Sequence, residues 1–119
     1  MNRKKVLIID DDLVICQSVI DVLEIKGYHP VATSGGKQGI EYLKSMIEQP
    51  CVILLDIIMP MINGWQVMDF LKQNPLFSKI PVIVFSESAS IESSINFVAF
   101  VPKPIEMKSL INAVKAFCD

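Results

Sequence analysis

The apolar run from Val52 to Leu55, which ends directly in Asp56, constrains the fold of this chain more than any other stretch. Consecutive apolar residues followed by turn residues indicate a strand that is buried on both faces of a parallel sheet. Asp56 then lies at the carboxyl end of this strand, the edge at which open α/β sheets bind their ligands. A carboxylate is costly to bury without compensation. Asp56 therefore either caps the following loop or has a cation-binding or chemical role.

The rest of the chain alternates between strand patterns and helix patterns. Pro30 places its segment at an edge of the sheet rather than at the centre. The predicted strands are Val6–Ile9, His29–Thr33, Val52–Leu55, Pro81–Phe85 and Ala99–Val101, and the predicted helices are Leu13–Lys26, Ser34–Ile47, Gly64–Asn74, a short Ile91–Asn96 and Met107–Phe117.

The helix boundaries and buried faces follow from capping residues and helical spacing. Asp12 is placed to cap the first helix and Gly27 to end it, and Ser34 is the expected cap of the second. The side chains expected to point inward are Ile40, Leu43 and Ile47 in the second helix, and Met107, Leu110, Ile111, Val114 and Phe117 in the last.

This alternation predicts a parallel sheet with right-handed crossovers. The fold class is α/β, a flavodoxin-like doubly wound sheet of five strands in the order 2-1-3-4-5, with about five helices. This strand order is the one known from doubly wound proteins, because residue patterns alone do not determine which strands are neighbours. A length of 119 residues corresponds to one domain, which we assign to residues 1–119.

Charge and composition exclude several classes of function. The net charge of −2 and the absence of a basic stripe argue against direct binding of nucleic acid. The basic residues Arg3, Lys4 and Lys5 precede an apolar run too short for a signal peptide or a membrane span. We expect a soluble, cytoplasmic protein with no membrane insertion.

The cysteines Cys16, Cys51 and Cys118 are odd in number and scattered, without CxxC spacing. This pattern indicates neither a disulfide framework nor a zinc site. We expect buried free thiols in a reducing cytosol.

Polar residues follow four of the predicted strands at the same edge of the sheet. Asp10 and Asp11 follow the first, Asp56 ends the third, Ser86 follows the fourth and Lys103 follows the fifth. In the order 2-1-3-4-5 the first and third strands are neighbours, so the three carboxylates surround one crevice. Such a cluster favours a hard divalent cation, and Mg²⁺ suits carboxylate, carbonyl, water and phosphate oxygens. A metal lets an anionic phosphoryl group approach an aspartate nucleophile.

Each residue also has a simpler structural role available. One of the aspartates can be a helix cap, Ser86 a loop serine and Lys103 a solvated surface lysine. A shared position at one sheet edge favours the functional interpretation.

These stretches resemble the receiver domains of bacterial two-component response regulators. The resemblance covers nearly the whole chain. It rests on four stretches whose combination is specific, namely 6–12 (VLIIDDD), 54–60 (LLDIIMP) with Asn63-Gly64, 80–83 (IPVI) leading to Ser86, and 100–104 (FVPKP).

The resemblance implies roles for seven residues. Asp56 would be the phosphoacceptor, and Asp10 and Asp11 would hold Mg²⁺ together with Asp56 and the backbone carbonyl of Ile58. Ser86 would be the switch hydroxyl and Phe100 the switch aromatic. Lys103 would contact the phosphoryl group, and the peptide bond between Lys103 and Pro104 would be cis. The donor would be a histidine kinase or a histidine phosphotransfer protein, and a downstream protein partner would read the phosphorylated state.

Two departures from the family pattern bear on this interpretation. The stretch from Ser86 to Lys103 is about five residues shorter than usual, more than one helical turn, so the fourth helix is expected to be short or irregular. Glu87 stands where the family has a small residue, and its charge would repel a phosphodonor or slow attack by water unless it points to solvent.

We therefore expect a phosphoaccepting signalling switch that catalyses only its own phosphorylation and dephosphorylation. One alternative is a receiver-like protein-binding module that works without phosphorylation. Another is a Mg²⁺-dependent aspartyl phosphohydrolase, which is disfavoured because such enzymes place a second acid where this chain has Ile58.

Overall fold

The computed structural model describes residues 4–56, 63–86, 99–102 and 105–118. The strands lie close to their predicted positions, and the helices differ from prediction mainly at their ends. The elements in chain order are β1 (Lys5–Ile9), α1 (Leu13–Ile25), β2 (His29–Thr33), α2 (Gly36–Ser45), β3 (Val52–Asp56), α3 (Gly64–Gln73), β4 (Val82–Ser86), β5 (Ala99–Pro102) and α4 (Met107–Cys118).

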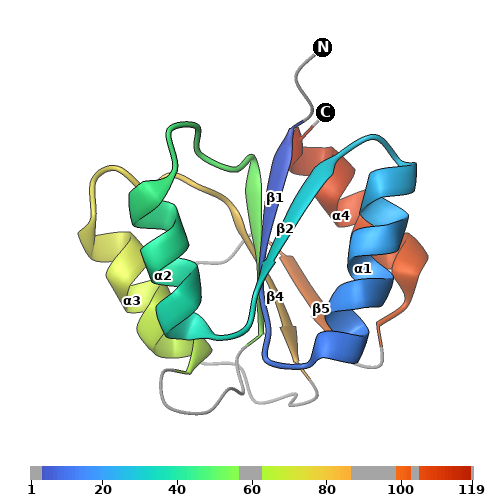
Figure 1. The fold of residues 1–119 in the computed structure, drawn as a ribbon, viewed down its shortest axis with the longest axis horizontal. Helices are drawn as coiled ribbons and strands as arrows, with labels where there is room; N and C mark the ends of the chain where they lie inside the picture. The colour runs from blue at the N-terminus through green and yellow to red at the C-terminus, as the bar shows by residue number, and fades with distance from the viewer. Residues whose placement is uncertain (1–3, 57–62, 87–98, 103–104, 119) are drawn as a thin grey trace.

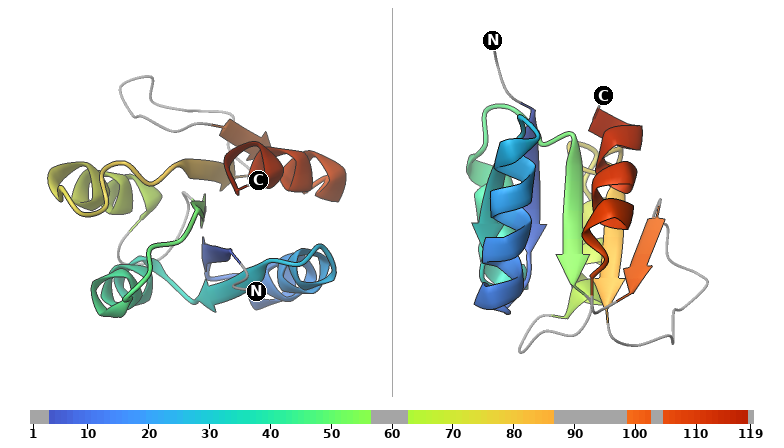
Figure 2. Two further views of the ribbon diagram at one scale, coloured as in Figure 1. Left: turned by 90° about the horizontal axis from the view of Figure 1, so that it is seen from above. Right: turned by 90° about the vertical axis from the view of Figure 1, so that its right-hand side faces the viewer.

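The five strands form one parallel sheet in the order β2-β1-β3-β4-β5, which confirms the predicted fold class. β3 is central, and all its residues are buried, as the apolar run in the sequence predicted. The strand arrows in the right-hand view of Figure 2 run in one direction, so the carboxyl ends of all strands meet at one edge. The short helix predicted at 91–96 lies outside the described residues.

Helices cover both faces of this sheet. α1 and α4 lie on one face and α2 and α3 on the other (Figures 1 and 2). Alternate side chains of β1 point to opposite faces of the sheet. Ile8 packs into the core beneath α1 and α4, and Ile9 packs into the core beneath α2 and α3. No described helix has the length and apolar character that crossing a membrane requires.

The ends of α1 are capped as the sequence predicted. The backbone N–H of Val14 donates to Oδ1 of Asp12 at 3.1 Å. At the other end Gly27 has a φ of +93°, a left-handed conformation that glycine adopts without steric cost. The N–H of Tyr28 donates to the carbonyl of Leu23, and that of Gly27 to the carbonyl of Glu24, which together form a Schellman motif. The chain thereby turns sharply from α1 into β2.

Two predictions for α2 were wrong. Gly35, not Ser34, occupies the N-cap position, and it makes no side-chain capping bond. Ile47 is fully exposed, because the helix ends at Ser45 and the chain no longer follows helical geometry there. Leu43, one turn earlier, is buried as expected.

The end of α4 also differs from prediction. Phe117 was expected in the core but is 38% exposed, whereas Cys118 is buried. Both positions lie near the inward stripe of Leu110 and Val114. Of the two residues, it is Cys118 that packs into the core beside β3.

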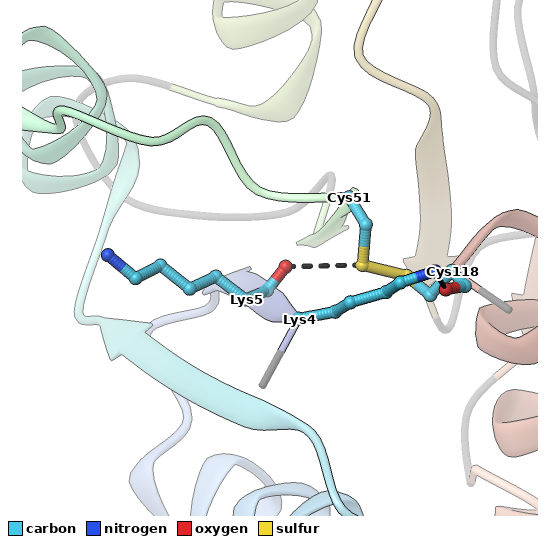
Figure 3. Close-up of a disulfide and its surroundings, with 4 residues drawn as sticks. All are labelled: Lys4, Lys5, Cys51 and Cys118. Atoms are coloured by element: carbon cyan, nitrogen blue, oxygen red, sulfur yellow. Dashed lines mark hydrogen bonds between the residues drawn. A yellow bond between two sulfur atoms is a disulfide. The ribbon is translucent and has the colours of Figure 1, made fainter. Parts of the chain in front are cut away.

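The prediction that all cysteines are free thiols was wrong for two of them. Cys51 and Cys118 form a disulfide across 67 residues of sequence, whereas Cys16 is a buried thiol outside this bond. Sequence spacing could not indicate this pair because the cysteines meet only when α4 returns to the start of β3. Figure 3 shows the bond and its surroundings.

Candidate functional site

The carboxyl ends of β1 and β3 bring three aspartates together. Ile9 of β1 pairs with Leu55 of β3, so Asp10 follows β1 beside the position of Asp56. Carboxylate oxygens of Asp10, Asp11 and Asp56 lie within 4.8 Å of one another. The strand-end argument from the sequence predicted this meeting of side chains, and the geometry follows from the register of two neighbouring parallel strands.

Burial differs sharply within this carboxylate cluster. Asp10 is 0% exposed and Asp56 3%, whereas Asp11 lies at the surface. Charges at such short separations repel strongly once water is removed from between them. The cluster is therefore a set of hard oxygen donors whose charge calls for a cation, and its chemistry fits Mg²⁺.

Backbone contacts fix the orientation of Asp10. The N–H of Asp12 donates to Oδ1 of Asp10 at 2.9 Å, and the N–H of Asp10 donates to the carbonyl of Thr33 at 3.2 Å. From α1, the Cys16 thiol donates to the carbonyl of Asp10 at 3.6 Å. Among the described residues, no buried side-chain oxygen or nitrogen lacks a hydrogen-bond partner. Contacts with Thr33 of β2, with Asp12 and with Cys16 of α1 thus hold Asp10 in place.

The sequence did not single out Thr33 or Cys16 as supports of this site. Thr33 closes β2, and its hydroxyl donates to the carbonyl of Ile8 at 3.0 Å. Both contacts depend on backbone carbonyls and on the packing of α1 and β2 around β1, so no residue pattern in the sequence reveals them.

The other predicted site residues are placed by their backbone or lie outside the described residues. Ser86 ends β4 one residue after Phe85, the partner of Asp56, so its backbone lies at the same sheet edge. Phe100 lies within β5 opposite Val84. The side chains of Ser86 and Phe100 are not among those described. The remaining predictions outside the described residues concern Ile58, Glu87, Lys103 and Pro104.

Comparison with known proteins agrees with this fold. The family model for the response regulator receiver domain matches residues 6–115. The polar-differentiation response regulator DivK of Brucella anthropi is 28% identical over 119 residues, which cover 96% of this chain and 95% of DivK. The probable transcriptional regulator ycf27 of Cyanophora paradoxa is 27% identical over 92% of this chain, but the match spans 46% of that protein. This chain thus spans nearly all of one curated relative and about half of another.

Solved structures share the fold closely. The chemotaxis protein CheY4 of Vibrio cholerae superposes with a TM-score of 0.88 at 20% identity, covering 98% of this chain and 99% of that one. The receiver domain of the Francisella response regulator 1452 superposes with a TM-score of 0.86 at 25% identity, covering 97% and 96%. Because the family model matches residues 6–115, most of this chain, the chain belongs to the response regulator receiver domain family, whose members are signalling switches.

Proposed function

We propose that this receiver domain is a phosphoaccepting switch of a two-component phosphorelay in which Asp56 takes the phosphoryl group. The observation that carries the proposal is the meeting of Asp56 with Asp10 and Asp11 within 4.8 Å at the carboxyl edge of the sheet. The donor is the phosphohistidine of a histidine kinase or of a histidine phosphotransfer protein. The chain catalyses only its own phosphorylation and dephosphorylation and does not turn over a separate substrate.

The carboxylate cluster is proposed to bind Mg²⁺ through Asp10, Asp11 and Asp56, with the backbone carbonyl of Ile58 as a further ligand. When bound, Mg²⁺ neutralises the charge that would otherwise keep an anionic phosphoryl group from an anionic nucleophile. Asp10 is suited to a ligand role because its carboxylate is already oriented by the N–H of Asp12. Asp11, being exposed, gives the cation a route from solvent.

In the proposed transfer, a carboxylate oxygen of Asp56 attacks the phosphorus atom and forms an acyl phosphate. The bond between phosphorus and the donor imidazole nitrogen breaks, and its electron pair stays on the imidazole. Asp56 is 3% exposed and is the last residue of β3, so its carboxylate lies at the carboxyl edge of the sheet. The backbone of β3 holds it there through pairing on both sides.

Three further roles complete the proposal. Lys103 is proposed to neutralise a phosphoryl oxygen, Ser86 to donate a hydrogen bond to another, and Phe100 to change position with the phosphorylated state. The position of Ser86 at the end of β4, beside the partner strand of Asp56, supports its role. We place the protein in the cytoplasm and propose that a protein partner, rather than nucleic acid, reads the switch.

The experiment is intact-mass measurement after incubation with acetyl phosphate, with Mg²⁺ or with EDTA. We expect a hydroxylamine-labile phosphoryl adduct that requires Mg²⁺ and disappears in Asp56→Asn. Asp69→Asn is the matched control, because Asp69 is an exposed carboxylate on α3, away from the cluster. A histidine kinase domain as donor provides a second arm.

The two arms separate the proposal from the alternatives. Adduct formation that persists in Asp56→Asn would show that another residue accepts the phosphoryl group. If neither donor modifies the folded protein, the chain is a binding module that works without phosphorylation. Release of phosphate from unrelated phosphomonoesters would instead indicate a phosphohydrolase.

A further inference from the structure

The disulfide lies at the opposite end of the sheet from the carboxylate cluster. Cys51 directly precedes β3, which ends in Asp56, and Cys118 is the last residue of α4. Their Cα atoms are 5.3 Å apart, within the range that a disulfide can bridge. We propose that Cys51 and Cys118 form a reversible thiol–disulfide switch that fastens the end of α4 to the start of β3. The inference rests on the proposed function in one respect, the cytoplasmic location, where disulfides are typically transient and redox-sensing.

The surroundings of Cys51 accommodate the reduced state. Its Sγ lies 3.3 Å from the backbone carbonyl oxygen of Lys5, a distance at which a thiol donates a hydrogen bond to oxygen (Figure 3). The same carbonyl accepts the N–H of Cys51 at 2.9 Å, and a carbonyl has two lone pairs. In the disulfide this sulfur carries no hydrogen. Reduction therefore gives the new thiol a ready acceptor in place of the lost covalent bond.

The two sulfurs differ in access. Cys51 is half-buried, whereas Cys118 is only 1% exposed and belongs to the core beneath α1 and α4. A small thiolate therefore reaches Cys51 first and displaces Cys118 as the leaving thiolate. The ammonium group of Lys4 donates to the carbonyl oxygen of Cys118, which places a positive charge beside the residue whose sulfur must leave (Figure 3). A nearby cation stabilises a thiolate.

The exchange balances with a low-molecular-weight disulfide such as oxidised glutathione as the oxidant. The Cys51 thiolate attacks one sulfur of the small disulfide and expels a small thiolate, leaving a mixed disulfide on Cys51. The Cys118 thiolate then attacks the Cys51 sulfur and expels the second small thiolate. In total, the two cysteine thiols are oxidised to one disulfide, and the small disulfide is reduced to two thiols. Reduced glutathione reverses both steps.

The bond affects α4 more at its end than along its length. Leu110, Ile111 and Val114 are buried and α4 packs against β3 and β5, so we expect this packing to keep the helix on the sheet after reduction. The last turn, with Phe117 already partly exposed, depends most on the covalent bond. The reduced protein should stay folded, lose amide protection in the final turn of α4 and melt about 10 °C lower, since the unfolded chain is no longer cross-linked.

The test places the folded, full chain in buffers with a graded ratio of reduced to oxidised glutathione. Free thiols are alkylated after acid quenching, and the labelled peptides are mapped by mass spectrometry. We expect a Cys51–Cys118 link whose occupancy rises with the oxidised fraction, reaches a plateau and falls again on returning to reduced glutathione. Cys16, which is 3% exposed, should stay a thiol throughout.

Two results would overturn the switch. A link that survives millimolar reduced glutathione in the folded protein would make it a permanent structural disulfide. A pair that excess oxidised glutathione leaves as two thiols, or joins between molecules, would mean that the 51–118 bond does not form in the folded chain.

Variants separate this inference from phosphorylation. Cys51→Ser and Cys118→Ser should each abolish the redox dependence of the melting temperature, whereas Cys16→Ser, the matched control, should keep it. Asp56→Asn should titrate with glutathione like the wild type, because the disulfide and the carboxylate cluster lie at opposite ends of β3. Failure of the acetyl phosphate experiment would thus leave the thiol result intact, and the reverse also holds.

Discussion

Gly39 of α2 lies directly against Ile9 of β1, so that a Cβ atom on Gly39 would fall 2.5 Å from Cδ1 and 2.7 Å from Cγ1 of Ile9. Ile9 is fully buried and immediately precedes Asp10. The close approach of helix and strand therefore sets the position of the residue that leads into the carboxylate cluster.

We expect Gly39→Ala to destabilise the protein, because the new Cβ forces the fully buried Ile9 side chain to shift within the core. The strain of overpacking, about 1–3 kcal/mol, outweighs the gain in helix propensity of about 1 kcal/mol. Urea unfolding monitored by circular dichroism measures the difference. The double variant Gly39→Ala with Ile9→Val removes a methyl group at the contact and should recover part of the loss. Equal stability of Gly39→Ala and wild type would show that the helix shifts away at no cost.

Sequence patterns predicted the strands well because their signal is local. β1, β3 and β4 are apolar runs ended by a charged or polar residue, and the predicted bounds differ from the observed ones by at most one residue at each end. The order of the strands is not local information. It was taken from known doubly wound proteins, and the observed sheet agrees with it.

Helix ends were predicted less well because periodicity does not state where a helix stops. Ile47 continues the spacing of Leu43 but lies beyond the last residue of α2. The inward direction of Cys118 rather than Phe117 depends on β3, which is distant in sequence. The Cys51–Cys118 disulfide was not predicted for the same reason, since only the folded chain brings these residues together.

The candidate site was predictable where strand ends alone decide it. Asp10 and Asp56 meet because neighbouring parallel strands end together. The support of Asp10 by Thr33 and Asp12 uses backbone groups, which residue types do not specify. The roles of Ser86, Phe100 and Lys103 stay predictions.

The start of α3 offers a direct test of local capping. Asn63 and Gln66 form a capping box, in which each side chain accepts the other residue's N–H, at 3.0 and 2.8 Å. Asn63→Ala should therefore cost about 1 kcal/mol in the free energy of unfolding, measured by urea titration. Asn63→Asp keeps an acceptor at the helix start and should cost much less. If Asn63→Ala and Asn63→Asp are equally stable, the capping bond contributes nothing measurable.

The contrast between Leu43 and Ile47 tests the observed end of α2. Leu43 is 1% exposed and packs in the core beneath α2 and α3, whereas Ile47 is 100% exposed. Leu43→Ala should lose about 2–5 kcal/mol of stability, because it leaves a cavity. Ile47→Ala should change stability by less than about 0.5 kcal/mol. Thermal and urea unfolding of the two variants compare them directly, and a large loss for Ile47→Ala would place that side chain in the core after all.

Binding of Mg²⁺ to the carboxylate cluster should appear as a gain in stability that depends on Asp11. At a concentration ten times its dissociation constant, a ligand that binds only the folded state adds about 1.4 kcal/mol, or about 5 °C in melting temperature for a chain of this size. Asp11→Asn should reduce this gain because it removes a charged ligand.

Without Mg²⁺ the same variant should be at least as stable as the wild type, since it relieves repulsion by the buried Asp10 and Asp56 and buries no new group. Glu41→Gln, an exposed change on α2, is the control that should retain the full Mg²⁺ response. A Mg²⁺ response that is identical in Asp11→Asn and wild type would place the cation elsewhere on the protein.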